Sequence, residues 1–198
     1  TDGRILVRGK LVARGKRKRA DYVLSYHPNV PVAVVEAKDA NHSVGDGMQQ
    51  ALAYAELLDV PFAFSTNGRA FLFHDRTATD GPLEREIPLD AFPTPAKLWE
   101  KYCAYRRLSP TPSGASERTS ISIAEQPYYS AERAPRYYQA RAINKVVEAI
   151  ARGEKRALLV MATGTGKTYT AFQIIWRLWK ARVAKRTHFL AERNILVE

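Results

Sequence analysis

Cysteine is nearly absent from this sequence, which holds a single one, Cys103, among its 198 residues. One cysteine excludes an internal disulfide framework and is typical of a reducing compartment. No apolar run approaches the length of about 20 residues that a membrane-spanning helix needs, and the first residues show no signal peptide. We therefore expect a soluble, cytoplasmic protein of one large or two small domains, with no membrane partner.

Negative charge is also scarce, because 20 acidic residues face 31 basic ones and leave a formal net charge of +11. Such an excess favours a polyanionic partner. The basic residues gather before residue 20 and after residue 110, whereas the segment between them is net acidic. The basic run at 16–19 precedes Asp21 directly, and we consider it either a phosphate contact or the solvated tip of a hairpin.

A short apolar run at 32–37 carries one carboxylate, Glu36, and a lysine follows at Lys38. Its length and β-branched residues predict a buried strand, on which Glu36 and Lys38 point to the same face. A second apolar run begins after Asp21, and turn-forming residues at 27–31 separate the two runs. An antiparallel pairing of these strands is expected to bring Asp21 close to Glu36 and Lys38.

Two carboxylates and a lysine at a strand end suit metal-assisted hydrolysis of a phosphodiester. Asp21 and Glu36 are expected to bind one or two Mg²⁺ ions, which polarise the phosphate and activate a water molecule. Lys38 is expected to orient that water or to stabilise the negative charge that develops. Taken alone, the pattern is short and equally describes a surface strand that ends with an ordinary glutamate–lysine pair.

A helix is predicted at 48–58 by its composition and apolar period, directly after the residues Gly45-Asp-Gly47. Gln50 and Tyr54 are four residues apart and therefore share one face of this helix. We expect that face to point to the site formed by the two strands. The alternative for Tyr54 is a place in the core, because Leu58 continues the same face.

The order of these residues resembles that of PD-(D/E)xK nucleases of the RecB-like type. The sequence around these residues is similar to that of the motor subunit of type I restriction enzymes. There Arg-Ala-Asp-Tyr-Val-Leu, Val-Val-Glu-Ala-Lys and Gln-Gln-Ala-x-x-Tyr-Ala stand in this order before a helicase. The resemblance implies one catalytic set, made of Asp21, Glu36, Lys38, Gln50 and Tyr54.

The next part of the chain predicts the rest of an α/β domain and its end. A hairpin with an Asn-Gly turn is expected at 62–74, and Thr94-Pro95 begins a helix. A stretch rich in serine and proline at 109–116 has linker composition. We therefore predict three parts, which are a PD-(D/E)xK endonuclease domain with an incomplete N-terminus at 1–107, a linker at 108–134, and the truncated start of a RecA-like helicase domain at 135–198.

A phosphate-binding loop lies in this last part. Residues 156–161 predict a buried strand, the loop ends in Gly-Lys-Thr, and a helix is predicted to follow to about residue 181. The strict pattern has glycine where Met161 stands, and superfamily 2 helicases and translocases resemble this sequence in lacking it. We expect the loop to bind the phosphates of ATP through backbone N–H groups and Lys167, with Thr168 as a ligand of Mg²⁺. The residues predicted to bind the nucleotide here are Thr163, Gly164, Thr165, Gly166, Lys167 and Thr168.

Two further segments resemble superfamily 2 ATPases. Gln139, three residues after Arg136, is similar to the glutamine that reads adenine, and the alternative is a solvent-exposed glutamine. Residues 188–194 predict a second core strand and resemble the motif Ia that contacts nucleic acid. No Asp-Glu-x-x motif follows Thr168, so we expect the 198 residues alone not to hydrolyse ATP.

The joint resemblance implies an ATP-driven translocase that cuts duplex DNA away from its recognition site. It also implies a methyltransferase subunit and a specificity subunit as partners, with the target sequence read by another subunit. One alternative is a different helicase–nuclease fusion, such as a type III-like restriction subunit, in which the order of the two domains is reversed. Another is a DNA-binding or anchoring module whose nuclease is inactive.

Overall fold

The computed structural model describes residues 19–28, 30–108, 123–130 and 134–190, together with the backbone of 5–8 and 11–14. Two short strands, β1 (Ile5–Arg8) and β2 (Leu11–Arg14), pair antiparallel, as their apolar runs suggest. Of the basic run before Asp21, residues 16–18 lie outside the described part.

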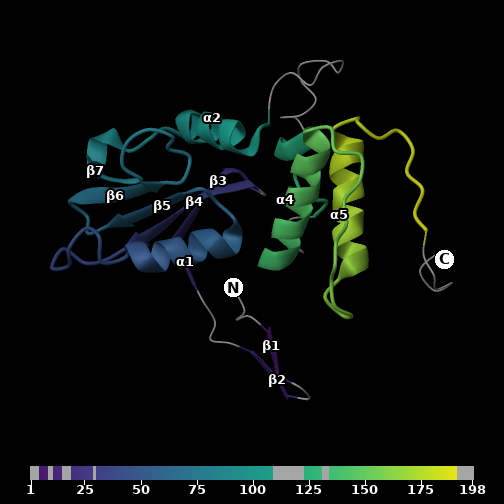
Figure 1. The fold of residues 1–198 in the computed structure, drawn as a ribbon, viewed down its shortest axis with the longest axis horizontal. Helices are drawn as coiled ribbons and strands as arrows, with labels where there is room; N and C mark the ends of the chain where they lie inside the picture. The colour runs from purple at the N-terminus through teal and green to yellow at the C-terminus, as the bar shows by residue number, and fades with distance from the viewer. Residues whose placement is uncertain are drawn as a thin grey trace.

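A five-stranded sheet lies between α1 and α2 on one side of the molecule (Figure 1). Its strands, in order across the sheet, are β3 (Tyr22–His27), β4 (Val30–Ala37), β5 (Phe62–Thr66), β6 (Ala70–Asp75) and β7 (Glu84–Pro88). The β4–β5 pair is parallel and the other neighbours are antiparallel. The sheet with its helices confirms the predicted α/β class.

One helix connects the two parallel strands. Helix α1 (Met48–Leu58) follows β4 and covers one face of the sheet, where Met48, Ala51 and Ala55 are buried against Val34 and Ala63. Parallel strands require such a crossover, which explains why a helical period separates two apolar runs. The predicted helix at 48–58 is confirmed.

The opposite face of the sheet is covered by α2 (Pro95–Arg106), which a short 3₁₀ turn, η1 (Leu89–Ala91), precedes. The hydroxyl of Thr94 accepts a hydrogen bond from the N–H of Lys97 at 3.3 Å, so the predicted cap is present. Helix α2 buries Leu98, Trp99 and Tyr102 in the core that Phe62 and Phe64 of β5 enter.

Two helices from the second half stand beside this layered unit (Figure 1). Helix α4 (Tyr137–Ala151) contacts both α1 and α5 (Lys167–Lys180). Its residues Ile143, Val147 and Ala151 belong to the same buried cluster as the aromatic residues of the sheet and α2. One core therefore continues from the sheet into the second half of the chain.

The connector at 123–130 is packed onto α5. Tyr129 meets the rings of Phe172 and Trp176 edge-on, and its N–H donates to the side chain of Gln173 at 2.9 Å. Arg177 of α5 is buried and donates to the backbone carbonyl of Ala124. These contacts attach the segment before α4 to the surface of α5.

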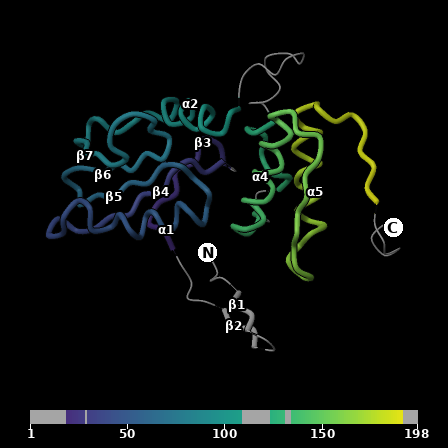
Figure 2. Tube along the Cα trace, in the orientation of Figure 1, coloured from purple at the N-terminus to yellow at the C-terminus, as the bar shows by residue number. Residues whose placement is uncertain are grey.

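The strand predicted at 156–161 is not formed. These residues connect α4 to the predicted phosphate loop, along the course that the Cα tube follows in Figure 2, and pair with no other strand in the described part of the chain. Leu158 and Val160 are 88% and 90% exposed. An apolar run becomes a strand only when a neighbouring edge supplies hydrogen bonds. Residues 188–190 are likewise not in a strand, and 191–194 lie outside the described residues.

Strand β7 was not predicted. Its sequence, Glu-Arg-Glu-Ile-Pro, is charged and largely exposed, as suits an edge strand. No helix in the described ranges has both the length and the apolar character needed to span a membrane.

Candidate functional site

The β3–β4 pair brings the two predicted carboxylates together. Tyr22 pairs with Val35, so Asp21 and Glu36 lie side by side at the end of the ladder. The N–H of Ala37 donates to Asp21 Oδ2 at 2.9 Å, and the N–H of Asp21 lies 3.3 Å from Glu36 Oε1. The predicted juxtaposition of Asp21 and Glu36 is confirmed.

Glu36 is fully buried, with 0% of its surface exposed. Its Oε2 is buried and has no hydrogen-bond partner among the residues that the structure describes. Burial raises the pKa of Glu36 from 4.5 to about 7; the N–H of Asp21 opposes the shift, and the Asp21 carboxylate adds to it. A buried, unsatisfied carboxylate is costly unless a cation or proton joins it.

Lys38 faces a polar pair on α1. Its Nζ lies 3.3 Å from Gln50 Oε1, and Gln50 Nε2 lies 3.3 Å from the hydroxyl of Tyr54. The N–H of Lys38 donates to the carbonyl of Thr66 on β5 at 2.8 Å. The structure therefore places Gln50 and Tyr54 beside Lys38, as their spacing predicts, while part of the Tyr54 side chain also packs on the core beneath α1.

The donor set fits Mg²⁺. In the described ranges, no three side chains of the histidine, cysteine or acidic type gather into a metal site, so Asp21 and Glu36 stand as a pair of carboxylates. Mg²⁺ commonly takes one or two carboxylates and fills its remaining positions with water and substrate phosphate. The unpartnered oxygen of Glu36 is the observation that favours a cation here.

Two residues that the sequence did not single out shape this site. Gly47, just before α1, lies so close that an added Cβ would stand 2.8 Å from Ser65 Oγ and 3.1 Å from Glu36 Cβ. Its N–H donates to Ser65 Oγ at 3.1 Å, and Ser65 is the parallel neighbour of Glu36 in the sheet. The only sequence signal for Gly47 is its position directly before a helix.

The predicted phosphate loop contains two glycines with positive φ. Gly164 and Gly166 have φ values of 78° and 86°, a region that glycine adopts without strain. Thr165 Oγ1 donates to the carbonyl of Ala162 at 2.6 Å, which closes the loop. Helix α5 begins at Lys167, so the free N–H groups of its first turn stand at the loop.

The side chains at the start of α5 are accessible. Lys167 and Thr168 are both exposed, and Lys167 Nζ lies 3.3 Å from the carbonyl of Met161 within its own loop. Thr168, the third predicted metal ligand, lies in the first turn of α5, after this loop, and not beside Asp21 and Glu36. The predicted metal residues therefore divide between two sites.

Gln139 reaches this loop from α4. Its Oε1 accepts from the N–H of Arg136 at 2.9 Å, and its Nε2 donates to the carbonyl of Thr165 at 2.8 Å. Gln139 is buried, so the alternative of a solvent-exposed glutamine is wrong. A pocket of about 250 Å³ beside it is lined by Ala134, Arg136, Gln139, Gly164, Thr165, Gly166 and Tyr169.

Two family models match separate parts of the chain. Residues 1–88 match the family described as the N terminus of the type I restriction enzyme R protein. Residues 132–198 match the family described as the res subunit of type III restriction enzymes.

Individual relatives agree over nearly the whole chain. The chain is 53% identical over 200 residues to the type I restriction enzyme EcoAI endonuclease subunit of Escherichia coli, covering all of this chain and 24% of that protein. It is 29% identical over 222 residues to the EcoKI endonuclease subunit of E. coli K12, covering 93% of this chain and 18% of that one. The chain thus spans about a quarter or less of these relatives.

A solved structure gives the same answer. A fragment assigned to the HsdR subunit of a type I restriction enzyme from Vibrio vulnificus superposes with a TM-score of 0.74 at 46% identity, covering 92% of this chain and 32% of that one. Motif order, fold and these matches together show that the chain belongs to the family of type I restriction enzyme R subunits.

Proposed function

We propose that this chain carries the DNA-cleaving site of a type I restriction enzyme and the nucleotide-binding loop of its motor. In this proposal duplex DNA is cut with Mg²⁺, and ATP-driven translocation brings the DNA to the site. The observation that carries the proposal is the unpartnered, buried Glu36 Oε2 beside Asp21, with Lys38, two residues farther along the chain, bonded to Gln50.

Each residue of the cleavage site has a defined task. Asp21 and Glu36 bind Mg²⁺, which when bound polarises the phosphate and activates water. The Lys38 ammonium stabilises negative charge on the phosphate, a task that suits a fixed cation in a partly buried site. Gln50 holds that ammonium in place, and the Tyr54 hydroxyl holds the Gln50 amide.

The nucleotide site uses the loop and the two helices that meet there. The N–H groups from Thr163 to Gly166 and the Lys167 ammonium bind phosphate, and Thr168 supplies a hydroxyl for Mg²⁺. Gln139 positions the loop through the Thr165 carbonyl. Both polar atoms of its amide are used within the protein, so recognition of adenine by Gln139 requires one of these bonds to exchange.

The partners proposed are double-stranded DNA, a methyltransferase subunit and a specificity subunit. Net charge of +11 supports the first, because basic residues compensate phosphate charge. The relatives are named as endonuclease subunits of type I restriction enzymes, which supports a complex of several subunits. A methyltransferase and a specificity subunit are what the resemblance to these enzymes implies.

The test is cleavage by the full-length subunit assembled with its partners. We expect Asp21→Asn, Glu36→Gln and Lys38→Met each to lower Mg²⁺-dependent cleavage by about 10²-fold or more while ATP hydrolysis persists. Asp90→Asn, which removes an exposed carboxylate from η1, is the matched control and should cut normally. Normal cleavage by any of the three variants would remove that residue from the site.

A further inference from the structure

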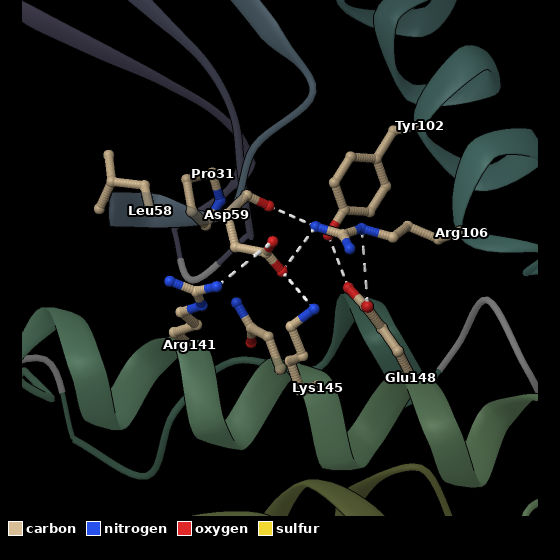
Figure 3. A pocket seen from close by; sticks show the side chains of 9 residues that line it. Pro31, Leu58, Asp59, Tyr102, Arg106, Arg141, Lys145 and Glu148 are labelled. Carbon is tan, nitrogen blue, oxygen red and sulfur yellow. Dashed lines mark hydrogen bonds and ion pairs between the residues drawn. The ribbon is translucent and has the colours of Figure 1, made fainter. Parts of the chain in front are cut away.

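A cluster of charged side chains lies where α1 ends, α2 ends and α4 passes (Figure 3). Asp59 follows α1, Tyr102 and Arg106 project from α2, and α4 contributes the rest. The members from α4 are spaced so that one face of that helix presents them all, and they are Arg141, Lys145 and Glu148. None of these residues belongs to the cleavage site or the phosphate loop.

Asp59 is the centre of the cluster. Its Oδ2 lies 2.9 Å from Arg106 Nη2 and 2.9 Å from Lys145 Nζ, and its Oδ1 lies 3.9 Å from Arg141 Nη2. Burial by itself raises the pKa of Asp59, but Lys145, Arg106 and Arg141 outweigh it and lower the pKa overall. The carboxylate is therefore ionised at neutral pH and pairs with three cations.

Glu148 completes the contact from the side of α4. Its carboxylate is almost fully buried, accepts a hydrogen bond from the Tyr102 hydroxyl at 2.6 Å, and lies 3.7 Å from Arg106 Nε. Arg106 of α2 therefore pairs with two carboxylates, Asp59 at the end of α1 and Glu148 on α4. Figure 3 shows Arg141, Lys145 and Glu148 extending from α4 toward Asp59 and Arg106.

The cluster connects two helices that each reach a site. Helix α1 carries Gln50 in its first turn and Tyr54 one turn later, and it ends at Asp59, whose φ of 59° closes the helix. Helix α4 carries Gln139 at its first turn, where it bonds the phosphate loop, and carries Lys145 farther along. One helix therefore leads from each site to the cluster.

We infer that Asp59 and Lys145 are positioning residues, through which α4 of the motor half holds α1 so that Gln50 keeps Lys38 in place for cleavage. The inference rests on the proposed function of the cleavage site and adds a dependence of that site on the docking of α4. It concerns positioning alone, because neither residue belongs to the proposed cleavage site.

The experiment uses the full-length subunit in its assembled complex. Asp59→Asn keeps the shape of the side chain and tolerates the left-handed backbone, since asparagine favours that region. Lys145→Gln alters a side chain that is 50% exposed, so folding should survive. We expect each variant to lower the maximal cleavage rate about fivefold or more. ATP hydrolysis and the Mg²⁺ concentration for half-maximal cleavage should stay within twofold, because Asp21 and Glu36 are untouched.

Three further variants sharpen the result. Lys145→Arg keeps the charge and should restore cleavage, and the double variant of Asp59→Asn with Lys145→Gln should lose no more than either single change, because the two residues act as one unit. Glu56→Gln, an exposed carboxylate on the same helix α1, is the control and should leave cleavage unchanged.

The outcomes separate this inference from the proposed function. Unchanged cleavage in both Asp59→Asn and Lys145→Gln overturns the inference. A lower cleavage rate that is accompanied by a higher Mg²⁺ concentration for half-maximal cleavage also overturns it, because that result indicates a general loss of structure. Asp21→Asn is measured alongside. If that variant still cuts, the proposed cleavage site itself is wrong, whatever Asp59 does.

Discussion

Glu36 combines two properties that rarely occur together in a carboxylate, complete burial and an oxygen without a partner. The N–H of Asp21 and the Lys38 ammonium favour its charge, but burial and the Asp21 carboxylate outweigh them. The residue is therefore best accommodated either with a proton or with a cation. Binding of Mg²⁺ should therefore change the protonation of Glu36 and, with it, the stability of the folded protein.

The raised pKa predicts how stability depends on pH. Because the folded pKa, about 7, exceeds the ordinary 4.5, the native state holds the proton more tightly. This contribution to stability is present below pH 4.5 and is lost as the pH rises to about 7. Glu36→Gln should abolish that loss and raise the free energy of unfolding at pH 8 by roughly 1–3 kcal/mol.

Urea denaturation at pH 5 and pH 8 measures this effect. Glu86→Gln, on the exposed edge strand β7, should change neither value. Added Mg²⁺ should stabilise the wild type at pH 8 and leave Glu36→Gln unaffected, because binding to the native state alone raises stability. Equal responses of the two proteins to Mg²⁺ would contradict the assignment of Glu36 as a ligand.

At this scale the sequence predicts contacts between adjacent strands but not contacts between layers. The proximity of Asp21 and Glu36 follows from one short turn and a period of two. The contact of Gly47 with Ser65 depends on how closely α1 approaches the sheet, which side-chain volumes throughout the layer determine. The Asp59 pairs depend on how α4 is docked, and a local sequence pattern contains no information on that.

Helix α1 approaches the sheet closely because its first turn is preceded by a residue without a Cβ. Gly47 has a φ of −87°, so alanine fits the backbone and only the crowding against Ser65 and Glu36 opposes it. We expect Gly47→Ala to lower the free energy of unfolding by about 1–3 kcal/mol, the usual range for overpacking. Chemical denaturation of the variant measures this change.

Gly45→Ala is the matched control. There the added Cβ meets only the flexible end of Leu72, at 3.3 Å, so the loss should be clearly smaller. Ser65→Ala combined with Gly47→Ala should be less destabilising than the sum of the single changes, since the closest obstacle is the Ser65 hydroxyl. Strict additivity would show that the crowding arises elsewhere.

Elements were predicted well where their own sequence contains both a period and a boundary. The β3–β4 pair has a turn between apolar runs, and α2 has Thr94 and Pro95 at its start. The edge strand β7 lacked an apolar face and was missed. The run at 156–161 has the composition of a strand, but a strand exists only with a partner, and composition does not reveal whether one is present.

For the whole molecule, Lys167 tests whether the motor and the cleavage site are separate. In the full-length subunit, Lys167→Ala should lower ATP hydrolysis by about 10²-fold or more and stop translocation, because the charge opposite the phosphates is lost. Cleavage far from the recognition site should cease with it. The stabilisation of the folded protein by Mg²⁺, which depends on Glu36, should persist, since Lys167 begins α5 and is not part of the proposed cleavage site.

ATP turnover and Mg²⁺-dependent unfolding, measured on the same preparation, check this expectation. Lys155→Ala, an exposed lysine in the segment before the loop, is the control for loss of charge. Turnover at the normal rate in Lys167→Ala would show that this loop is not the motor's nucleotide site.

The continuous core has a consequence for exchanging parts among relatives. Ile143, Val147 and Ala151 of α4 fill the same interior as Phe62 of the sheet and Trp99 of α2. A cut at the linker between α2 and α4 separates side chains that pack on one another. A chimera that joins the sheet of one relative to the motor of another must therefore take α4 and the sheet from the same relative. The segment that has to be exchanged as a whole is longer than the segment that contains the cleavage residues.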